Sequence, residues 1–81
     1  MPGMVQRAEL AAFLRSRREA TNPVEVGFQP GPRRRTPGLR REEVAQLSGV
    51  IVTWYTWLER ARDISVSRQV LESLARALRA E

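Results

Sequence analysis

The sequence predicts an all-α fold, a small bundle of four helices. Apolar residues recur every three or four positions in four separate stretches, the spacing that lines one face of an α-helix. No stretch shows the strict alternation of a half-buried strand. One long segment rich in proline and glycine separates the first helical stretch from the other three. With 81 residues the chain can bury one core, so we take residues 1–81 as a single domain.

The first helix is expected to run from Val5 to Ala20. Its inner face should carry Leu10, Phe13, Leu14 and Arg17 or Arg18. Segment 21–38 follows and holds four of the five prolines and three of the five glycines, a composition that prevents a continuous helix. We therefore expect an irregular insert, which its three large apolar side chains could pin to the core: Val24, Val26 and Phe28.

The second helix is expected from Arg40 to Ser48, with Val44, Ala45 and Ser48 facing inward. Gly49 should end it.

The third helix, from Val52 to Ala61, is amphipathic. Tyr55 and Leu58 lie on one side of it. The opposite side carries Thr53, Thr56, Trp57 and Arg60. Ser67 is a good N-cap for the fourth helix. The apolar stripe of that helix is Leu71, Leu74, Ala75 and Leu78.

The amino-acid composition excludes several classes of function. The chain has neither cysteine nor histidine, which removes disulfides, thiolate nucleophiles and the usual zinc ligands. We expect no enzyme, no metal and no cofactor. All fourteen basic residues are arginines, against nine acidic residues, and the net charge of +5 suits an anionic partner such as nucleic acid, although a merely solubilising surface explains the charge equally well. Because no secretion signal or membrane span is evident, we expect a cytoplasmic protein without membrane contact.

Residues 40–61 have the pattern of a helix-turn-helix, two short helices joined by a turn that contains glycine. Ala45 is small where the helices should cross, Gly49 can adopt a left-handed conformation, and Val50 can fill the corner between the helices. A plain helical hairpin could share this pattern.

The strings RTPGLRREEVAQL and TWYTWLE, with the first helix before them, resemble the phage-repressor (Cro and cI-like, or XRE) family. The similarity is closest to the DNA-binding domain of MmyB-like transcriptional regulators. It covers about seventy residues. This resemblance implies a bacterial regulator that binds double-stranded DNA, often as a homodimer, with its third helix in the major groove. Because only three residues follow Leu78, we expect neither the family's fifth helix nor its ligand-binding domain here, whether the chain is a fragment of a longer regulator or a free-standing module.

The resemblance also implies residue roles. Val52, Thr53 and Trp57 match the positions that contact bases. Phosphate contacts fall on Arg40 and Arg41 at the start of the second helix and on Arg60 and Arg62 after the third. Arg35, in the run Arg33–Arg35, is a further phosphate candidate, although a solvated loop explains that run equally well. Arg18 and Glu59 match an ion pair between the first and third helices; without the family pattern they would be two unrelated surface charges.

Two residues depart from the family pattern. Ile51 stands where serine or threonine usually caps the recognition helix, and apolar residues are poor caps. Ala61 stands where glycine usually ends that helix, so the end is either strained or replaced by a longer helix.

Two other functions remain open. Trp54 and Trp57 could anchor a partner of a protein-interaction adaptor, although we expect Trp54, at the boundary of the two faces, to pack against the second helix or the insert. The scattered arginines fit a membrane-surface helix less well.

Overall fold

Four α-helices and one short 3-10 helix make up the computed structural model, which describes residues 3–29 and 37–78. The fold is all-α, as predicted, and no strand occurs among these residues. The helices are α1 (Met4–Ala20), η1 (Pro23–Val26), α2 (Arg41–Ser48), α3 (Val52–Glu59) and α4 (Arg68–Ala77). Within the described ranges, no helix is long and apolar enough to cross a membrane.

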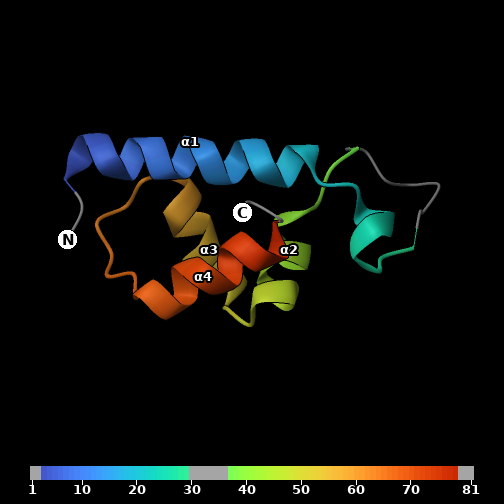
Figure 1. Cartoon of the computed structure of the whole chain (residues 1–81). Coiled ribbons are helices and arrows are strands. Elements are labelled where there is room, and N and C mark those ends of the chain that lie inside the picture. Colours follow the sequence, from blue (N-terminus) through green and yellow to red (C-terminus); the bar gives the residue numbers. More distant parts are fainter. Residues whose placement is uncertain (1–2, 30–36, 79–81) are drawn as a thin grey trace.

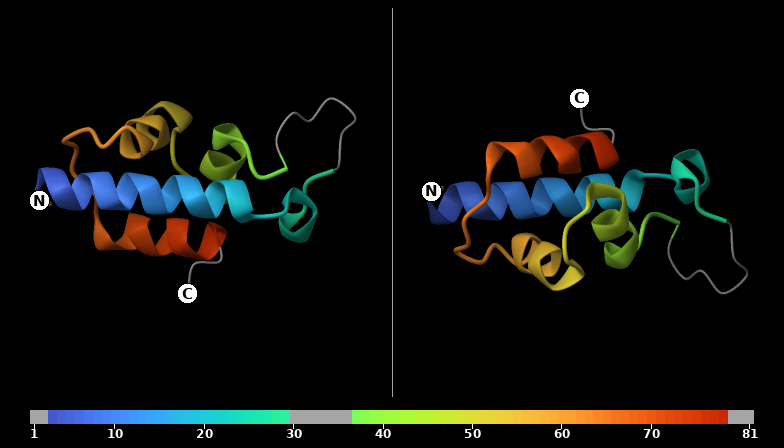
Figure 2. Two further views of the ribbon diagram at one scale, coloured as in Figure 1. Left: turned by 90° about the horizontal axis from the view of Figure 1, so that it is seen from above. Right: turned by 90° about the horizontal axis from the view of Figure 1, so that it is seen from below.

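The long helix α1 runs along the whole bundle, and the three shorter helices lie against it (Figure 1). Seen from above and below, α2 and α3 lie on one side of α1 and α4 on the other (Figure 2). Helix α3 packs on α1, and α2 packs on both α3 and α4. The molecule is therefore a bundle in which α3 joins α1 to α2, and α2 in turn packs on α4.

One contiguous apolar core joins these elements. Its buried residues are Leu14, Leu39, Val44, Tyr55, Leu58, Leu74 and Leu78. Trp54, which was expected at the boundary of α3, packs against this core and is only partly exposed. Tyr55 is the largest fully buried side chain, so α3 is fixed in the bundle by its middle.

Both ends of α2 and the start of α4 are capped; the sequence predicted the caps at Gly49 and Ser67 but not the one where α2 begins. The Glu43 carboxylate accepts a hydrogen bond from the Arg40 backbone N–H at 2.7 Å, which satisfies a free amide where α2 begins. Gly49 ends α2 in the left-handed region at φ +75°. At α4, the Ser67 hydroxyl accepts from the Val70 N–H at 3.1 Å, which confirms the predicted N-cap.

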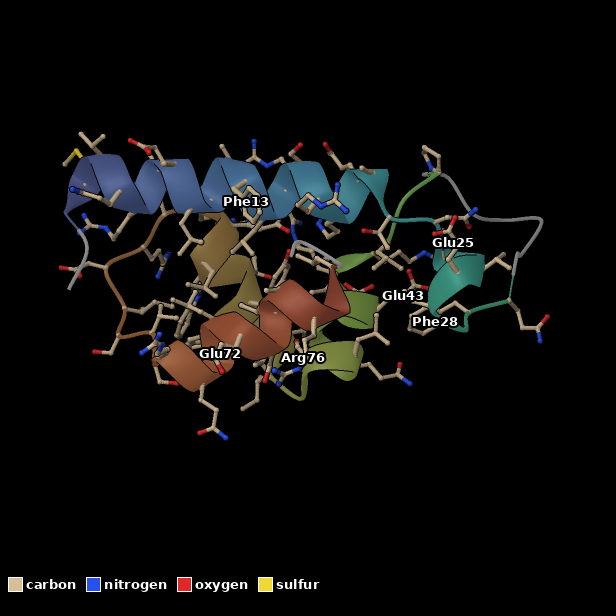
Figure 3. The ribbon with its side chains drawn as sticks, viewed as in Figure 1. Phe13, Glu25, Phe28, Glu43, Glu72 and Arg76 are labelled. Atoms are coloured by element: carbon tan, nitrogen blue, oxygen red, sulfur yellow. The ribbon has the colours of Figure 1, made fainter. Side chains whose placement is uncertain are left out.

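Two expectations about the apolar faces of the helices, and one about the structure of the insert, need correction. Phe13 is 49% exposed at the surface of α1 (Figure 3), because its helical position lies at the flank of the face that the bundle covers; Ala11 is buried on that face instead. Leu71 is similarly exposed at the flank of α4. The insert is not wholly irregular either, because Asn22 caps η1 through a hydrogen bond from the Val24 N–H to its side-chain oxygen.

The insert attaches to the core through part of the predicted set. Val26 and Phe28 pack against the core, and Figure 3 shows Phe28, which follows η1, directed toward the bundle. Val24 remains largely exposed. Beyond the insert, the Leu39 N–H donates to the Arg18 carbonyl oxygen at 2.9 Å, so the chain returns to the end of α1 before α2 begins.

Candidate nucleic-acid interface

Helix α3 has one buried and one outward face. Tyr55 and Leu58 are buried, whereas Thr53 is exposed and Val52 and Trp57 are partly exposed. The Thr56 hydroxyl donates to the Val52 carbonyl oxygen at 2.8 Å, within the helix itself. The outward face therefore presents the three residues expected to contact bases, Val52, Thr53 and Trp57.

The start of α3 carries an exposed apolar residue. Ile51 occupies the N-cap position without a side-chain cap hydrogen bond and is 74% exposed. Its poor capping was expected from its apolar side chain. The Ile51 side chain therefore caps none of the backbone amides in the first turn of α3. These amides lie at the same end of α3 as Val52 and Thr53.

Helix α3 ends in a Schellman motif. The Arg62 N–H donates to the Trp57 carbonyl oxygen and the Ala61 N–H to that of Leu58, both at 3.1 Å. Ala61 has φ +57°, in the left-handed region where glycine is favoured. Of the two outcomes that the sequence left open, the helix takes the strained end.

A buried carboxylate ties α3 to α1 and α2. Arg18 donates to Glu59 through Nε at 2.6 Å and through Nη2 at 3.0 Å, so the ion pair expected from the resemblance is present. Arg41 donates to the same carboxylate through Nε at 3.2 Å, and the Tyr55 hydroxyl donates to it as well. Arg18 also donates to the Leu39 carbonyl oxygen at 3.1 Å. One network therefore fixes the relative positions of the three helices.

The protonation states in this network follow from its hydrogen bonds. Burial alone would raise the pKa of the Glu59 carboxyl group, but hydrogen bonds from Arg18, Tyr55 and Arg41 outweigh burial and hold that pKa below its usual range. The hydrogen bond to Glu59 raises the pKa of Arg18. Burial and the bond to Glu59 raise the pKa of the Tyr55 hydroxyl far above its usual value. Glu59 is thus charged and Tyr55 neutral at neutral pH.

The arginines expected to contact phosphate have different surroundings. Arg40 and Arg60 are exposed. Arg41 is 40% exposed, and its Nε is held by Glu59, so the planar fork is partly oriented in advance. The Arg62 guanidinium carbon lies 5.6 Å from the centre of the Trp57 ring, a cation–π geometry. Arg35 lies outside the described residues.

Two arginines that the sequence interpretation did not use also reach α3. Arg7 donates through Nε to the Ala61 carbonyl oxygen at 3.2 Å, and Arg15 donates through Nη2 to that of Glu59 at 3.3 Å. Both come from α1 and bind carbonyl groups where α3 ends. Only the helical spacing of Arg7, Ala11, Arg15 and Arg18 along the side of α1 that meets α3 could have indicated them.

Two short helices, joined at a left-handed glycine and arranged so that the second exposes one face, define a helix-turn-helix module. The chain belongs to the helix-turn-helix domain family, since a family model described as "Helix-turn-helix domain" matches residues 9–81. Membership of this family indicates DNA binding. A search of curated proteins and a search of solved structures gave no match.

Proposed function

We propose that the chain is a sequence-specific regulator of transcription that binds double-stranded DNA, of the phage-repressor (XRE) type and similar to MmyB-like regulators. In this proposal helix α3 enters the major groove. The protein catalyses no reaction, needs no cofactor and acts in the cytoplasm of a bacterium. The observation that carries the proposal is the division of α3, with Tyr55 and Leu58 buried while Thr53 and Trp57 face outward beside arginines.

The proposed base contacts follow from side-chain chemistry. Thr53 combines a hydroxyl group, which can bond to base edges, with a methyl group that can pack on the thymine methyl. Val52 offers only apolar contact, and the Trp57 indole can bond or pack against a base edge. These side chains stand within two turns of α3, so they would read adjacent base pairs.

The proposed phosphate contacts come from arginines before α2, at its start and after α3 in the sequence. Arg40 and Arg41 stand where α2 begins, and backbone amides at helix starts also bind phosphate oxygens. Arg60 and Arg62 follow α3, and Arg35 precedes α2. Phosphate contacts fix the register on DNA without reading sequence, so the two sets of residues have separable effects.

Selection of binding sites from random duplexes tests the proposal, followed by titration of the selected site and of a scrambled one. Thr53→Ala and Trp57→Ala should reduce the ratio of the two affinities. Arg68→Gln is the matched control, because Arg68 is 93% exposed on α4 and outside the proposed interface. A two-fold symmetric motif would support a homodimer. Negligible affinity for any duplex at low salt would overturn the proposal and favour the adaptor function.

A further inference from the structure

The turn after α3 is held by α1. Figure 1 shows the chain that leaves α3 passing beneath the N-terminal half of α1. Arg7 donates through Nε to the Ala61 carbonyl oxygen at 3.2 Å and pairs through Nη1 with the Asp63 carboxylate at 3.7 Å. The Arg7 side chain is only 19% exposed. A single planar guanidinium therefore spans both ends of a three-residue turn, a geometry that lysine cannot reproduce.

This turn carries a residue of the proposed interface. Arg62 lies between Ala61 and Asp63, and its N–H completes the Schellman motif on the Trp57 carbonyl oxygen at 3.1 Å. Its guanidinium lies over the Trp57 ring. Arg7 and Arg62 also line the same small pocket, whose other walls are mostly apolar. Arg7 thus binds the backbone carbonyl on one side of Arg62 and the Asp63 side chain on the other, while the Arg62 side chain stacks on Trp57.

Ala61 makes this support necessary. Its left-handed conformation at φ +57° is unfavourable for a residue with a Cβ atom, by about 1 kcal/mol. Arg15, about two turns further along α1 than Arg7, binds the Glu59 carbonyl oxygen at 3.3 Å. The motif itself satisfies the carbonyl oxygens of Trp57 and Leu58. The two arginines of α1 therefore bind carbonyl groups at the end of α3 that the helix does not bind itself.

We infer that Arg7 is a positioning residue for the DNA-binding face: it holds the turn at residues 61–63 so that Arg62 stays stacked on Trp57. The DNA-binding consequence rests on the proposed function, but the stacking does not. Arg7 affects the DNA contacts indirectly, through the turn, because its own guanidinium binds Ala61 and Asp63.

The test uses Arg7→Gln, with Arg17→Gln as the matched control. Arg17 is another arginine of α1 that binds a helix end, because its Nη2 donates to the Leu78 carbonyl oxygen at 3.1 Å, but that end belongs to α4. In the free protein, Trp57 should shift the proton resonances of the Arg62 side chain upfield. Arg7→Gln should abolish that shift, and Arg17→Gln should preserve it even if both variants lose similar stability. Arg7→Lys keeps the charge but lacks the planar guanidinium, so it should also lose most of the shift. This variant decides the test if Arg7→Gln does not fold.

DNA titration gives the second measurement. Arg7→Gln and Arg62→Gln should each weaken binding to the selected site by about tenfold, as expected for loss of one charge-assisted contact. The double variant should be no weaker than the weaker single variant, since both changes remove the same contact. An unchanged Arg62 shift in both Arg7 variants would overturn the inference, as would fully additive losses. Absence of DNA binding by the unsubstituted protein would count against the proposed function alone, and the resonance shifts would still decide the role of Arg7.

Discussion

At the scale of single residues, Glu59 is the centre of the structure, because one buried carboxylate receives hydrogen bonds from three helices. Arg18 supplies two of these bonds from α1, Arg41 one from α2 and Tyr55 one from α3 itself. A buried ion pair gains little net stability over an apolar pair, but removal of one partner leaves a buried charge undercompensated. The network therefore specifies how the helices fit together more than it adds stability.

Replacement of Arg18 by leucine should destabilise the protein by about 3 kcal/mol. The Glu59 carboxylate would lose the two hydrogen bonds from Arg18, and the Leu39 carbonyl oxygen would lose the bond from Arg18. Urea denaturation followed by circular dichroism measures this change. Arg68→Leu is the control and should shift the free energy of unfolding by less than about 0.5 kcal/mol, because its ion pair with Glu72 is exposed. A loss below about 1 kcal/mol in Arg18→Leu would contradict the prediction.

The same carboxylate predicts an acid-sensitive fold. The folded-state pKa of Glu59 is lowered from 4.5, so its charged form contributes stability that is present above pH 4.5 and is lost as pH falls through the lower folded value. Glu59→Gln should remove much of the decrease in unfolding free energy below pH 4.5. Glu72→Gln, at an exposed carboxylate on the outer surface of α4 (Figure 3), should leave that decrease in place. Equal acid sensitivity in both variants would show that other carboxyl groups cause it.

At the scale of elements, two glycines have different reasons to be glycine. A Cβ atom at Gly38 would lie 2.3 Å from the Glu19 carbonyl oxygen and 2.6 Å from that of Arg18, both backbone atoms at the end of α1. At Gly49 a Cβ atom would meet nothing within 4 Å, and the only obstacle is φ +75°. Gly38 is required for close approach of two backbones, and Gly49 for a left-handed turn.

Alanine substitutions separate these two requirements. Gly49→Ala should lower the melting temperature modestly, since the left-handed conformation costs about 1 kcal/mol with a Cβ atom. Gly38→Ala should lower stability by about 2–3 kcal/mol, because α1 and the start of α2 must move apart. Differential scanning calorimetry of both variants measures the contrast. If Gly49→Ala proved the more damaging, close packing at Gly38 would not be the dominant constraint.

Helical periodicity was sufficient to predict the four helices but not the limits of their buried faces. The predicted end of α1 agrees with the structure, and α3 ends at Glu59 rather than Ala61. Phe13 and Leu71 have helical spacing typical of core residues, yet each lies at the flank of its helix, where no other element covers it. Periodicity identifies the apolar direction of a helix, whereas the width of the covered face depends on tertiary packing.

At the scale of the whole molecule, the site is less predictable than the fold because it is assembled from distant parts of the chain. The sequence pattern placed Thr53 and Trp57 on one face of α3, which needs only local geometry. The contacts from Arg7 to Ala61 and from Arg15 to Glu59 span 54 and 44 positions, so no local pattern relates them. The Arg18–Glu59 pair spans 41 positions and was expected only from the family resemblance.

The charge distribution of the molecule predicts how salt weakens DNA binding. Each phosphate neutralised by an arginine releases condensed counterions, so the logarithm of the affinity falls with the logarithm of salt concentration by about 0.9 per contact. If five arginines bind phosphate, the slope should be about −4.5 per chain, and about twice that for a homodimer. The net charge of +5 is compatible with five phosphate contacts per chain, because other arginines pair with acidic groups of the protein.

Individual substitutions divide that slope among the arginines. Arg40→Gln should weaken binding to selected and scrambled duplexes by the same factor and reduce the slope by about 1, because Arg40 is exposed at the start of α2 and contacts no base in the proposal. Arg41→Gln should have the same effect on the slope and should also destabilise the fold, since it removes a bond to Glu59. Arg68→Gln carries the same change of charge on α4 and should leave the slope unchanged. A slope that fell equally in all three variants would indicate attraction by net charge alone and would remove the reason for placing the phosphate backbone beside α2.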